Sequence, residues 1–327
     1  MRTSRGELLR DAAPPFRDVR ALFAAASTDD VFVVCLDATE HFVWPALAVG
    51  DVVDVEVPDT SLAERKLVRL RTLSVRPRVF EIENMLSDAE CEHMIERAKR
   101  SSMFQSKIGG DSQKEGAYSR QRESRQAWIG PLTNSDDAVF ERVRNRTYAL
   151  ARVDDWTIGE DTQVVHYERT QHFYSHHDWI NTTDAVGNPY YEAGGNRLAT
   201  IIYYLNTVPA GGETVFPYAN NTLRPRGDYS YWATSARGKP HTYFGVEGCT
   251  EGGLAVKPRR GRAILFYNLL EHGTLDGVPD VWSLHAGCDV VRGEKFMANQ
   301  WIRNKRVWVP NDSKPGGGAM HLFDKTW

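Results

Sequence analysis

The sequence predicts an α+β chain that is mainly β and is built as an antiparallel sandwich or jelly roll. Short runs rich in β-branched and aromatic residues recur along the chain, whereas only two segments, both in the first half, have the apolar spacing of helices. The 9 Trp and 13 Tyr suit a β-rich fold with an aromatic-lined cleft. With 41% hydrophobic residues, the 327-residue chain can build one large domain with an extension.

Residues 1–75 are expected to form an N-terminal β-rich extension. Strands are predicted over Val31–Leu36, Asp51–Val57 and Arg65–Val75, the last because basic and apolar residues alternate along it. This part of the sequence contains no cluster of residues suited to catalysis. A structural role for the extension is therefore favoured over substrate positioning or partner binding.

Two helices are predicted before the central strands. The first begins at Ser87, because the sequence S-D-A-E places Glu90 where a capping box requires it. The second is predicted over Ser135–Arg152, where apolar residues recur with helical spacing.

The remaining regular elements are expected to be strands separated by two long loops. The loops are predicted over residues 101–121 and 220–258, which are rich in polar residues and glycine and lack periodicity. The strands are predicted in the segments Pro77–Asn84, Arg122–Ile129, Gln163–Tyr167, Arg197–Asn206, Gly211–Pro217, Arg262–Asn268, Ser283–Val291 and Glu294–Arg303. The last two are expected to pair as an antiparallel hairpin around Arg292-Gly293.

The charge and hydropathy of the sequence argue against two classes of partner. A net charge of -3 and a pI near 6.4 give no electrostatic footprint for nucleic acid or for an acidic membrane surface. No apolar run approaches the roughly 18 to 20 residues that a membrane span needs. The first residues lack the apolar core of a signal peptide.

The cysteines exclude two familiar motifs. None of them forms a C-x-x-C pair, so a zinc ribbon and a thioredoxin motif are excluded. Two disulfides are possible among Cys35, Cys91, Cys249 and Cys288, and the spacing leaves the pairing open. Glycosylation is left open at four N-x-S/T sequons, which begin at Asn145, Asn181, Asn220 and Asn311.

A candidate metal site lies at the end of the stretch Gln163–Ile180, which begins as a strand. His176 and Asp178 are separated by one residue, so their side chains share one face of an extended chain. An imidazole and a carboxylate are two of the three ligands of the 2-His-1-carboxylate site in non-haem Fe(II) oxygenases. His177 is expected to point the other way, toward the surface or a groove.

A third ligand and a cosubstrate pocket are expected near the C-terminal strands. His285 is the candidate ligand, and the predicted hairpin would present Lys295 from the following strand. A cation beside Fe(II) suits 2-oxoglutarate, because the carboxylate at its far end needs a charged partner when it is buried. Tyr167 and Thr214 are candidate hydroxyl donors to that carboxylate.

Several segments also occur in the order and spacing of one enzyme family. They are PRVFEIENMLSDAEC, QVVHY followed by Q-x-x-x-x-H-x-D, ATIIYYLN running into GGETVFP, and SLHAGCDVVRGEK with Trp301 beyond it. Over residues 76–303 the sequence resembles the Fe(II)- and 2-oxoglutarate-dependent prolyl 4-hydroxylases of the collagen, plant and algal type. The resemblance implies a double-stranded β-helix (jelly-roll) core with flanking helices. It places the dioxygenase domain at residues 76–309 and a C-terminal tail at 310–327.

The resemblance also implies roles for individual residues. The iron ligands would be His176, Asp178 and His285. The 2-oxoglutarate site would contain Tyr167, Thr214, Lys295 and Trp301. The substrate groove would contain Arg122, Ser124, Glu160, Phe173, Arg197 and Arg303. No catalytic group beyond the metal site is expected.

The sequence departs from the family pattern at three positions. Phe173 stands where the family often has Tyr, Arg303 replaces a His of the groove, and Asp289 replaces a Pro after Cys288. The first two bear on the preference for a peptide and leave the iron chemistry untouched. Lys295 favours the prolyl branch, because lysyl hydroxylases have Arg at the matching position.

The resemblance implies hydroxylation of peptidyl proline, with release of succinate and CO2. Fe(II), 2-oxoglutarate and O2 would be required, with ascorbate as the reductant, and the partner would be a proline-containing peptide or protein. Two alternatives stay open, namely hydroxylation of another side chain or of a small molecule such as free proline, and a catalytically inactive jelly-roll binding module. The resemblance favours the secretory pathway, and the missing signal peptide favours the cytoplasm.

Overall fold

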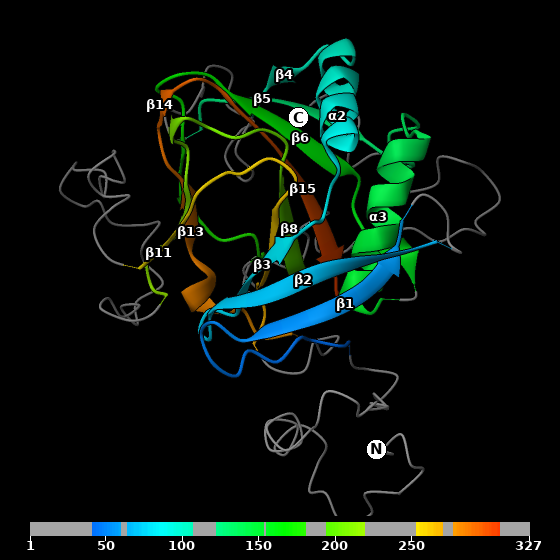
Figure 1. Ribbon diagram of the computed structural model, residues 1–327, viewed down its shortest axis with the longest axis vertical. Helices are drawn as coiled ribbons and strands as arrows, with labels where there is room; N and C mark the ends of the chain where they lie inside the picture. Colours follow the sequence, from blue (N-terminus) through cyan, green and yellow to red (C-terminus); the bar gives the residue numbers. More distant parts are fainter. Residues whose placement is uncertain are drawn as a thin grey trace, which may run out of the picture.

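The computed structural model describes residues 41–59, 64–106, 122–153, 155–180, 194–219, 253–270 and 277–307. Within them, two antiparallel sheets form the layers of a β-sandwich (Figure 1). The expected mainly β, jelly-roll architecture is confirmed. The predicted strand Val31–Leu36, the tail at 310–327 and most of both predicted loops lie outside the described residues.

The larger sheet has nine strands. In spatial order they are β1 (Val52–Pro58), β2 (Arg65–Ser74), β3 (Val79–Glu83), β12 (Ala263–Tyr267), β8 (Arg197–Tyr204), β15 (Lys295–Arg303), β6 (Thr162–Tyr167), β5 (Arg125–Ile129) and β4 (Phe104–Gln105). Strands β1 and β2 of the predicted extension therefore continue the sheet that contains β3. The division into domains at residue 75 stays a prediction.

The smaller sheet has four strands. They are β11 (Leu254–Val256), β10 (Thr214–Phe216), β13 (His285–Gly287) and β7 (Phe173–His176). A separate pair is formed by β14 (Val290–Arg292) and β9 (Ala210–Gly211). Strand β11 lies inside the segment 220–258 that was expected to be a loop, so that prediction was wrong for these residues.

The predicted hairpin of the two C-terminal strands is also wrong. Strand β13 pairs with β7 and β10, whereas β15 pairs with β6 and β8 in the other sheet. Strand β14 follows β13 and pairs with β9, and the turn at Gly293, where φ is 85°, carries the chain from that separate pair into the larger sheet. Alternation along a strand reveals which face is buried, and it does not identify the neighbouring strand.

The helices α2 (Asp88–Arg100) and α3 (Ala138–Ala151) pack on one face of the larger sheet. The capping box of α2 is confirmed: Glu90 N–H donates to Ser87 Oγ at 3.2 Å, and Ser87 N–H donates to the Glu90 carboxylate at 2.8 Å. Helix α3 starts later than predicted, because Asp137 accepts hydrogen bonds from the N–H groups of the first turn and acts as the N-cap.

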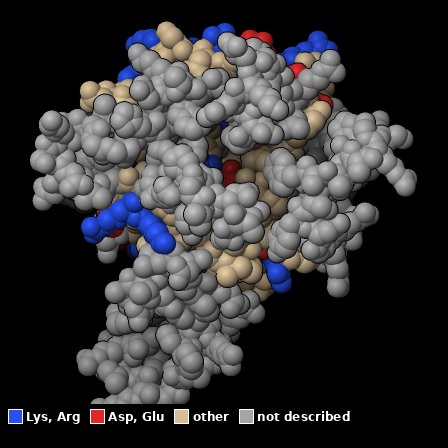
Figure 2. Space-filling view, turned by 180° about the vertical axis from the view of Figure 1, so that it is seen from behind, with Lys and Arg blue, Asp and Glu red and all other residues tan. Residues whose placement is uncertain are grey.

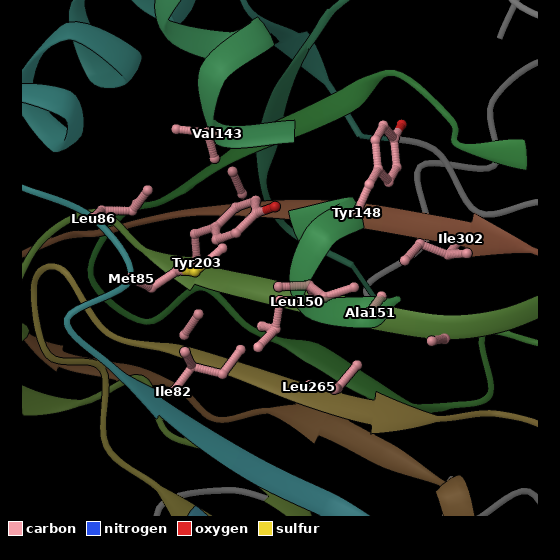
Figure 3. Packing of buried hydrophobic residues seen from close by; sticks show 14 of the residues in the cluster. Ile82, Met85, Leu86, Val143, Tyr148, Leu150, Ala151, Tyr203, Leu265 and Ile302 are labelled. Atoms are coloured by element: carbon pink, nitrogen blue, oxygen red, sulfur yellow. The ribbon is translucent and has the colours of Figure 1, made fainter. Parts of the chain in front are cut away.

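Both faces of the larger sheet are buried in its centre. In Figure 3, Val143 and Leu150 of α3 lie against Tyr203 of β8 and Leu265 of β12. The residues next to Tyr203 and Leu265 along the two strands, such as Tyr204, point to the opposite face of the sheet. They pack in the hydrophobic cluster between the two sheets. That inner face is where the site residues lie.

Lys/Arg and Asp/Glu side chains both occur, in small groups, on the face shown in Figure 2. No helix in the described parts of the chain is long and apolar enough to cross a bilayer. Of the described cysteines, Cys91 is a buried free thiol and Cys288 is in a disulfide.

Candidate active site

Three candidate metal ligands converge between the two sheets. The antiparallel register of β7 and β13 places His176 directly opposite His285, with ring centroids 4.3 Å apart. Asp178 lies two residues after His176 in the same segment, and its carboxylate lies close to both imidazole rings. One ligand atom from each residue lies within 4.8 Å of the other two.

Backbone carbonyls orient both imidazole rings. The Nδ1 atom of His176 lies 2.8 Å from Tyr174 O, and that of His285 lies 3.0 Å from Ser283 O. Since a carbonyl oxygen only accepts, each Nδ1 carries a proton, and Nε2 is the ring nitrogen left to bind a metal. Both Nε2 atoms face Asp178, at 3.7 Å from Oδ1 for His176 and at 3.8 Å from Oδ2 for His285.

The carboxylate of Asp178 is held through one of its oxygens. Its Oδ2 accepts a hydrogen bond from the Thr200 hydroxyl at 2.7 Å and one from the Trp301 indole N–H at 2.9 Å. Thr200 and Trp301 are direct cross-strand partners on β8 and β15, which explains why they reach the same atom. With Oδ2 occupied twice, Oδ1 is the oxygen left for a metal.

The electrostatics of these groups suit metal binding. Burial raises the pKa of Asp178, but the charges of His285, His176 and Arg197 outweigh burial and hold the pKa well below its usual range. Burial, together with the neighbouring His285, lowers the pKa of His176. The carboxylate is therefore ionised and the imidazole neutral at pH 7, which are the forms that bind a metal.

The donor set fits Fe(II). Two imidazole nitrogens and one carboxylate oxygen that lie close together match the 2-His-1-carboxylate arrangement of non-haem iron oxygenases. His177 does not join the group. Its Nε2 donates to Val281 O at 3.1 Å, and the side chain is half-buried rather than on the surface.

A buried cation lies on the same inner face, in the position predicted for the cosubstrate pocket. Lys295 is 2% exposed, and its ammonium nitrogen lies 5.6 Å from the ring centroid of Tyr167 and 5.8 Å from that of Tyr204. The Tyr204 hydroxyl donates to Thr214 Oγ1 at 3.0 Å. Thr214, a predicted hydroxyl donor to 2-oxoglutarate, is thereby linked to the aromatic residues around Lys295.

The ammonium group of Lys295 is available to an anion. Within the described residues, no carboxylate lies within ion-pair distance of it and no acceptor hydrogen-bonds to it. Burial lowers its pKa to about 8, and the charge of Glu213 opposes that shift only in part. A buried cation of this kind is stabilised by an incoming carboxylate, as the far end of 2-oxoglutarate would provide.

Comparison with known proteins gives the same assignment. Residues 162–303 match the family model of the 2OG-Fe(II) oxygenase superfamily. Prolyl 4-hydroxylase 2 of Arabidopsis thaliana is 32% identical over 239 residues, which cover 72% of this chain and 70% of the relative. The probable prolyl 4-hydroxylase 4 of the same plant is 34% identical over 239 residues, with the same coverage of both chains. The chain belongs to the prolyl 4-hydroxylase family of 2OG-Fe(II) oxygenases.

The resemblance stated from the sequence is thereby confirmed, and with it the enzyme class. Family members are dioxygenases that use Fe(II), 2-oxoglutarate and O2. Among solved structures, the viral collagen prolyl hydroxylase of Paramecium Bursaria Chlorella virus-1, in its 2OG complex, is 25% identical. That match covers 69% of this chain and 95% of the viral chain, with a TM-score of 0.45.

In this prolyl 4-hydroxylase relative, two arginines share one buried carboxylate. Glu160 is 1% exposed and receives bonds from Arg197 Nε and Nη2 at 2.7 and 2.9 Å and from Arg303 Nε at 2.8 Å. Burial would raise the pKa of Glu160, but the charges of and hydrogen bonds from the two arginines lower it to about 2. The three side chains form a buried ion network, and their predicted contact with a peptide stays a prediction.

The network also reaches the metal site. The guanidinium carbon of Arg197 lies 3.8 Å from the ring centroid of Trp301, and Arg197 Nη1 lies 3.9 Å from Asp178 Oδ1. Trp301 was predicted to line the 2-oxoglutarate pocket. Its observed polar contact is the metal-binding carboxylate, and its role toward the cosubstrate stays a prediction.

Two of the other predicted groove residues lie beside His176. Phe173 stacks on His176 with centroids 3.7 Å apart, and the Arg122 guanidinium lies 4.6 Å from the Phe173 ring centroid. Ser124 is buried, and its hydroxyl donates to Ser106 Oγ at 2.7 Å. The structure therefore places Arg122 and Phe173 next to His176. Ser124 lies next to Arg122, whose Nε donates to Ser124 Oγ at 3.4 Å.

Sequence reasoning missed three side chains at this site. They are Tyr204 beside Lys295, Thr200 beside Asp178, and Asn268 beside Thr200. A signal existed for Tyr204, because in a strand that is buried on both faces one tyrosine of the Tyr203-Tyr204 pair must face the site. No comparable signal marked Thr200 or Asn268, since both belong to ordinary strand sequences.

Proposed function

We propose that this protein hydroxylates a proline residue within a peptide or protein substrate. One observation carries the proposal: three candidate metal ligands and a buried lysine lie on the facing inner sides of the two sheets. That arrangement serves a metal and a dicarboxylate cosubstrate together. Proline is proposed as the substrate residue because the relatives include prolyl 4-hydroxylases.

In this proposal, separate groups of residues hold the metal and the cosubstrate. His176, Asp178 and His285 hold Fe(II), and Lys295 binds the C5 carboxylate of 2-oxoglutarate with help from Tyr167, Thr214 and Trp301. When bound, Fe(II) with 2-oxoglutarate and O2 supplies the oxidising chemistry that converts a C–H bond to C–OH and releases succinate and CO2. The protein positions these partners and excludes water from the space between the sheets.

The substrate side is proposed to lie next to Phe173 and Arg122. Phe173 presents an apolar ring beside His176, and Arg122 offers a cation over that ring. These groups suit a pyrrolidine ring and a backbone carbonyl of an extended segment. Ser124 would support Arg122, whose Nε donates to Ser124 Oγ at 3.4 Å. The network of Glu160, Arg197 and Arg303 would line the groove beside Asp178.

Three further assignments are part of the proposal. Residues 76–309 form the dioxygenase unit, with β1 and β2 as a structural addition to its larger sheet. Ascorbate serves as the reductant. The secretory pathway is the favoured compartment, because the resemblance that implies the activity also implies that location.

A turnover assay tests the proposed substrate class. Purified protein is supplied with Fe(II), 2-oxoglutarate, ascorbate and a panel that contains proline-rich peptides, lysine-containing peptides and free proline. Succinate formation and a product mass increase of one oxygen on peptidyl proline are expected. Turnover of free proline or another side chain, with none of any proline peptide, would overturn the peptidyl assignment.

Two variants separate the metal site from general effects on the protein. His176→Ala removes one of the three ligands and should abolish turnover of every substrate. His93→Ala is the matched control, because His93 lies on the helix α2 and pairs with Asp137 at 2.9 Å, on the face of the larger sheet opposite the site. Retention of activity in both variants would show that the reaction does not depend on this metal site.

A further inference from the structure

Asn268 directly follows β12, and its side chain is completely buried. Its N–H donates to Leu198 O at 2.9 Å, so its backbone continues the pairing of β12 with β8. In that pairing Phe266 lies opposite Thr200. Asn268, two residues beyond Phe266, therefore shares the inner face with Thr200, and its Nδ2 lies 2.8 Å from Thr200 Oγ1.

The direction of each hydrogen bond in this group follows from the chemistry of the atoms. The Asp178 carboxylate can only accept, so the Thr200 hydroxyl donates its one proton to Oδ2. Toward Asn268, the Thr200 oxygen can then only accept. The amide of Asn268 must therefore present its N–H2 group rather than its carbonyl oxygen.

The Asn268 amide keeps this orientation although its carbonyl oxygen makes no hydrogen bond within the described residues. That oxygen, Asn268 Oδ1, is buried. Leaving a buried acceptor unpaired is unfavourable. The bond to Thr200 is thus the one that fixes the amide, and the amide in turn occupies the lone pair of the hydroxyl.

We infer that Asn268 is a positioning residue for the metal-binding carboxylate and acts through Thr200. Its N–H2 group fixes the Thr200 hydroxyl with the proton aimed at Asp178 Oδ2. Thr200 and Trp301 together then saturate Oδ2 and leave Oδ1 for the metal. The inference rests on the proposed function in one respect, the assignment of Asp178 as an iron ligand.

The same strand supports a second ligand. The Phe266 ring lies 4.7 Å from the ring of His285, centroid to centroid. Strand β12 and the residue after it contribute no ligand, yet Phe266 contacts His285, and Asn268 reaches Asp178 through Thr200. This gives β12 a defined role in shaping the metal site from the larger sheet.

Metal affinity tests the inference without any substrate turnover. Co(II) is titrated into the metal-free protein, and its visible absorption reports the dissociation constant. Thr200→Val, which keeps the shape and removes the hydroxyl, should weaken binding about tenfold or more, and Asn268→Leu by about three- to tenfold. Thr200→Ser retains the hydroxyl and should restore affinity to within about twofold of the original protein.

The double variant decides between positioning and packing. If Asn268 acts through the Thr200 hydroxyl, adding Asn268→Leu to Thr200→Val should change Co(II) affinity by less than about twofold. Additive losses would overturn the inference, because a packing effect does not need the hydroxyl. An unchanged affinity in Asn268→Leu alone would overturn it as well.

Matched controls keep the result interpretable. Thr147→Val removes another completely buried hydroxyl, which bonds Tyr203 on the helix side of the sheet, and should leave Co(II) affinity unchanged. If Asn268→Leu does not fold, Asn268→Ala replaces it in the same cycle. Failure of every peptide assay would remove the proposed function and leave this measurement intact. Peptide turnover with additive Co(II) losses would remove only the inference.

Discussion

Lys295 lies directly opposite Tyr167 in the antiparallel register of β15 and β6. Both side chains point to the space between the two sheets, where burial lowers the pKa of Lys295 to about 8. The lysine is therefore charged at pH 7 but loses its proton at a lower pH than an exposed lysine would. Two predictions follow from this one position, one about cosubstrate binding and one about stability.

The first prediction concerns the pH dependence of 2-oxoglutarate binding. The ammonium form binds the carboxylate, so the dissociation constant should be steady below pH 8 and rise above it, by up to about tenfold per pH unit. Titration of 2-oxoglutarate into Co(II)-loaded protein between pH 7 and 9 measures this. Lys295→Arg is the control, because a guanidinium stays charged throughout the range and should give a flat profile. A flat profile in the original protein would place the C5 carboxylate elsewhere.

The second prediction concerns stability without cosubstrate. Lys295→Met replaces a buried ammonium, which has no acceptor within the described residues, by an apolar chain of similar length. We expect the free energy of unfolding of the metal-free protein at pH 7 to rise by roughly 1–3 kcal/mol. The gain should fade as the pH approaches 10, because the lysine is then neutral in the folded state at little cost. Urea denaturation at pH 7 and pH 10 measures both effects.

The same variant should lose the stabilisation that 2-oxoglutarate gives to the original protein. Melting curves with Co(II), recorded with and without 2-oxoglutarate, make this comparison. A variant that is less stable than the original protein at pH 7, or that keeps the full shift with 2-oxoglutarate, would contradict the assigned role of Lys295.

The inner face of the larger sheet explains which site residues the sequence could predict. Lys295, Trp301 and Arg303 are all odd-numbered positions of one strand, so period-two alternation alone places them on a common face. The spacing of His176 and Asp178 works in the same way. Side chains that act from a single strand or segment can thus be grouped by their spacing in the sequence alone.

The remaining relationships depend on which strands are neighbours. The hairpin predicted for His285 and Lys295 was wrong because the two residues lie in different sheets, and the chain between them passes through β14, which pairs with β9. The contacts of Asp178 with Thr200 and Trp301 arise from the pairing of β8 with β15, which local sequence does not encode. The family resemblance placed Glu160 in the groove, but the sequence did not show that arginines from two other strands enclose it.

The third prediction tests the hydrogen bond from Trp301 to the metal-binding carboxylate. Trp301→Phe keeps an aromatic ring beneath Arg197 and removes the indole N–H that Asp178 Oδ2 accepts. Co(II) affinity should fall by about tenfold. Trp44→Phe is the control, because it also removes a buried indole N–H, one that donates to Leu150 O at 2.8 Å, far from the metal site. Equal losses of affinity in both variants would assign the effect to general destabilisation.

The fourth prediction concerns the Glu160 network. Glu160→Gln preserves the shape of the side chain and leaves Arg197 and Arg303 without their shared counter-charge in a buried site. The free energy of unfolding at pH 7 should fall by about 3–5 kcal/mol, as when one partner of a buried ion pair is removed. Asp54→Asn breaks an exposed pair with Arg69 and should give no measurable change, since solvent screens that pair.

The pH dependence of this difference gives a second test. The pKa of Glu160 is lowered to about 2 from its ordinary 4.5, so its contribution is complete above pH 4.5 and is lost as the pH falls toward 2. The gap in stability between the original protein and Glu160→Gln should therefore be constant from pH 7 to about 5 and shrink below that. Urea denaturation across this range measures it. A gap that stays the same at pH 3 would show that the loss comes from packing of the amide rather than from the missing charge.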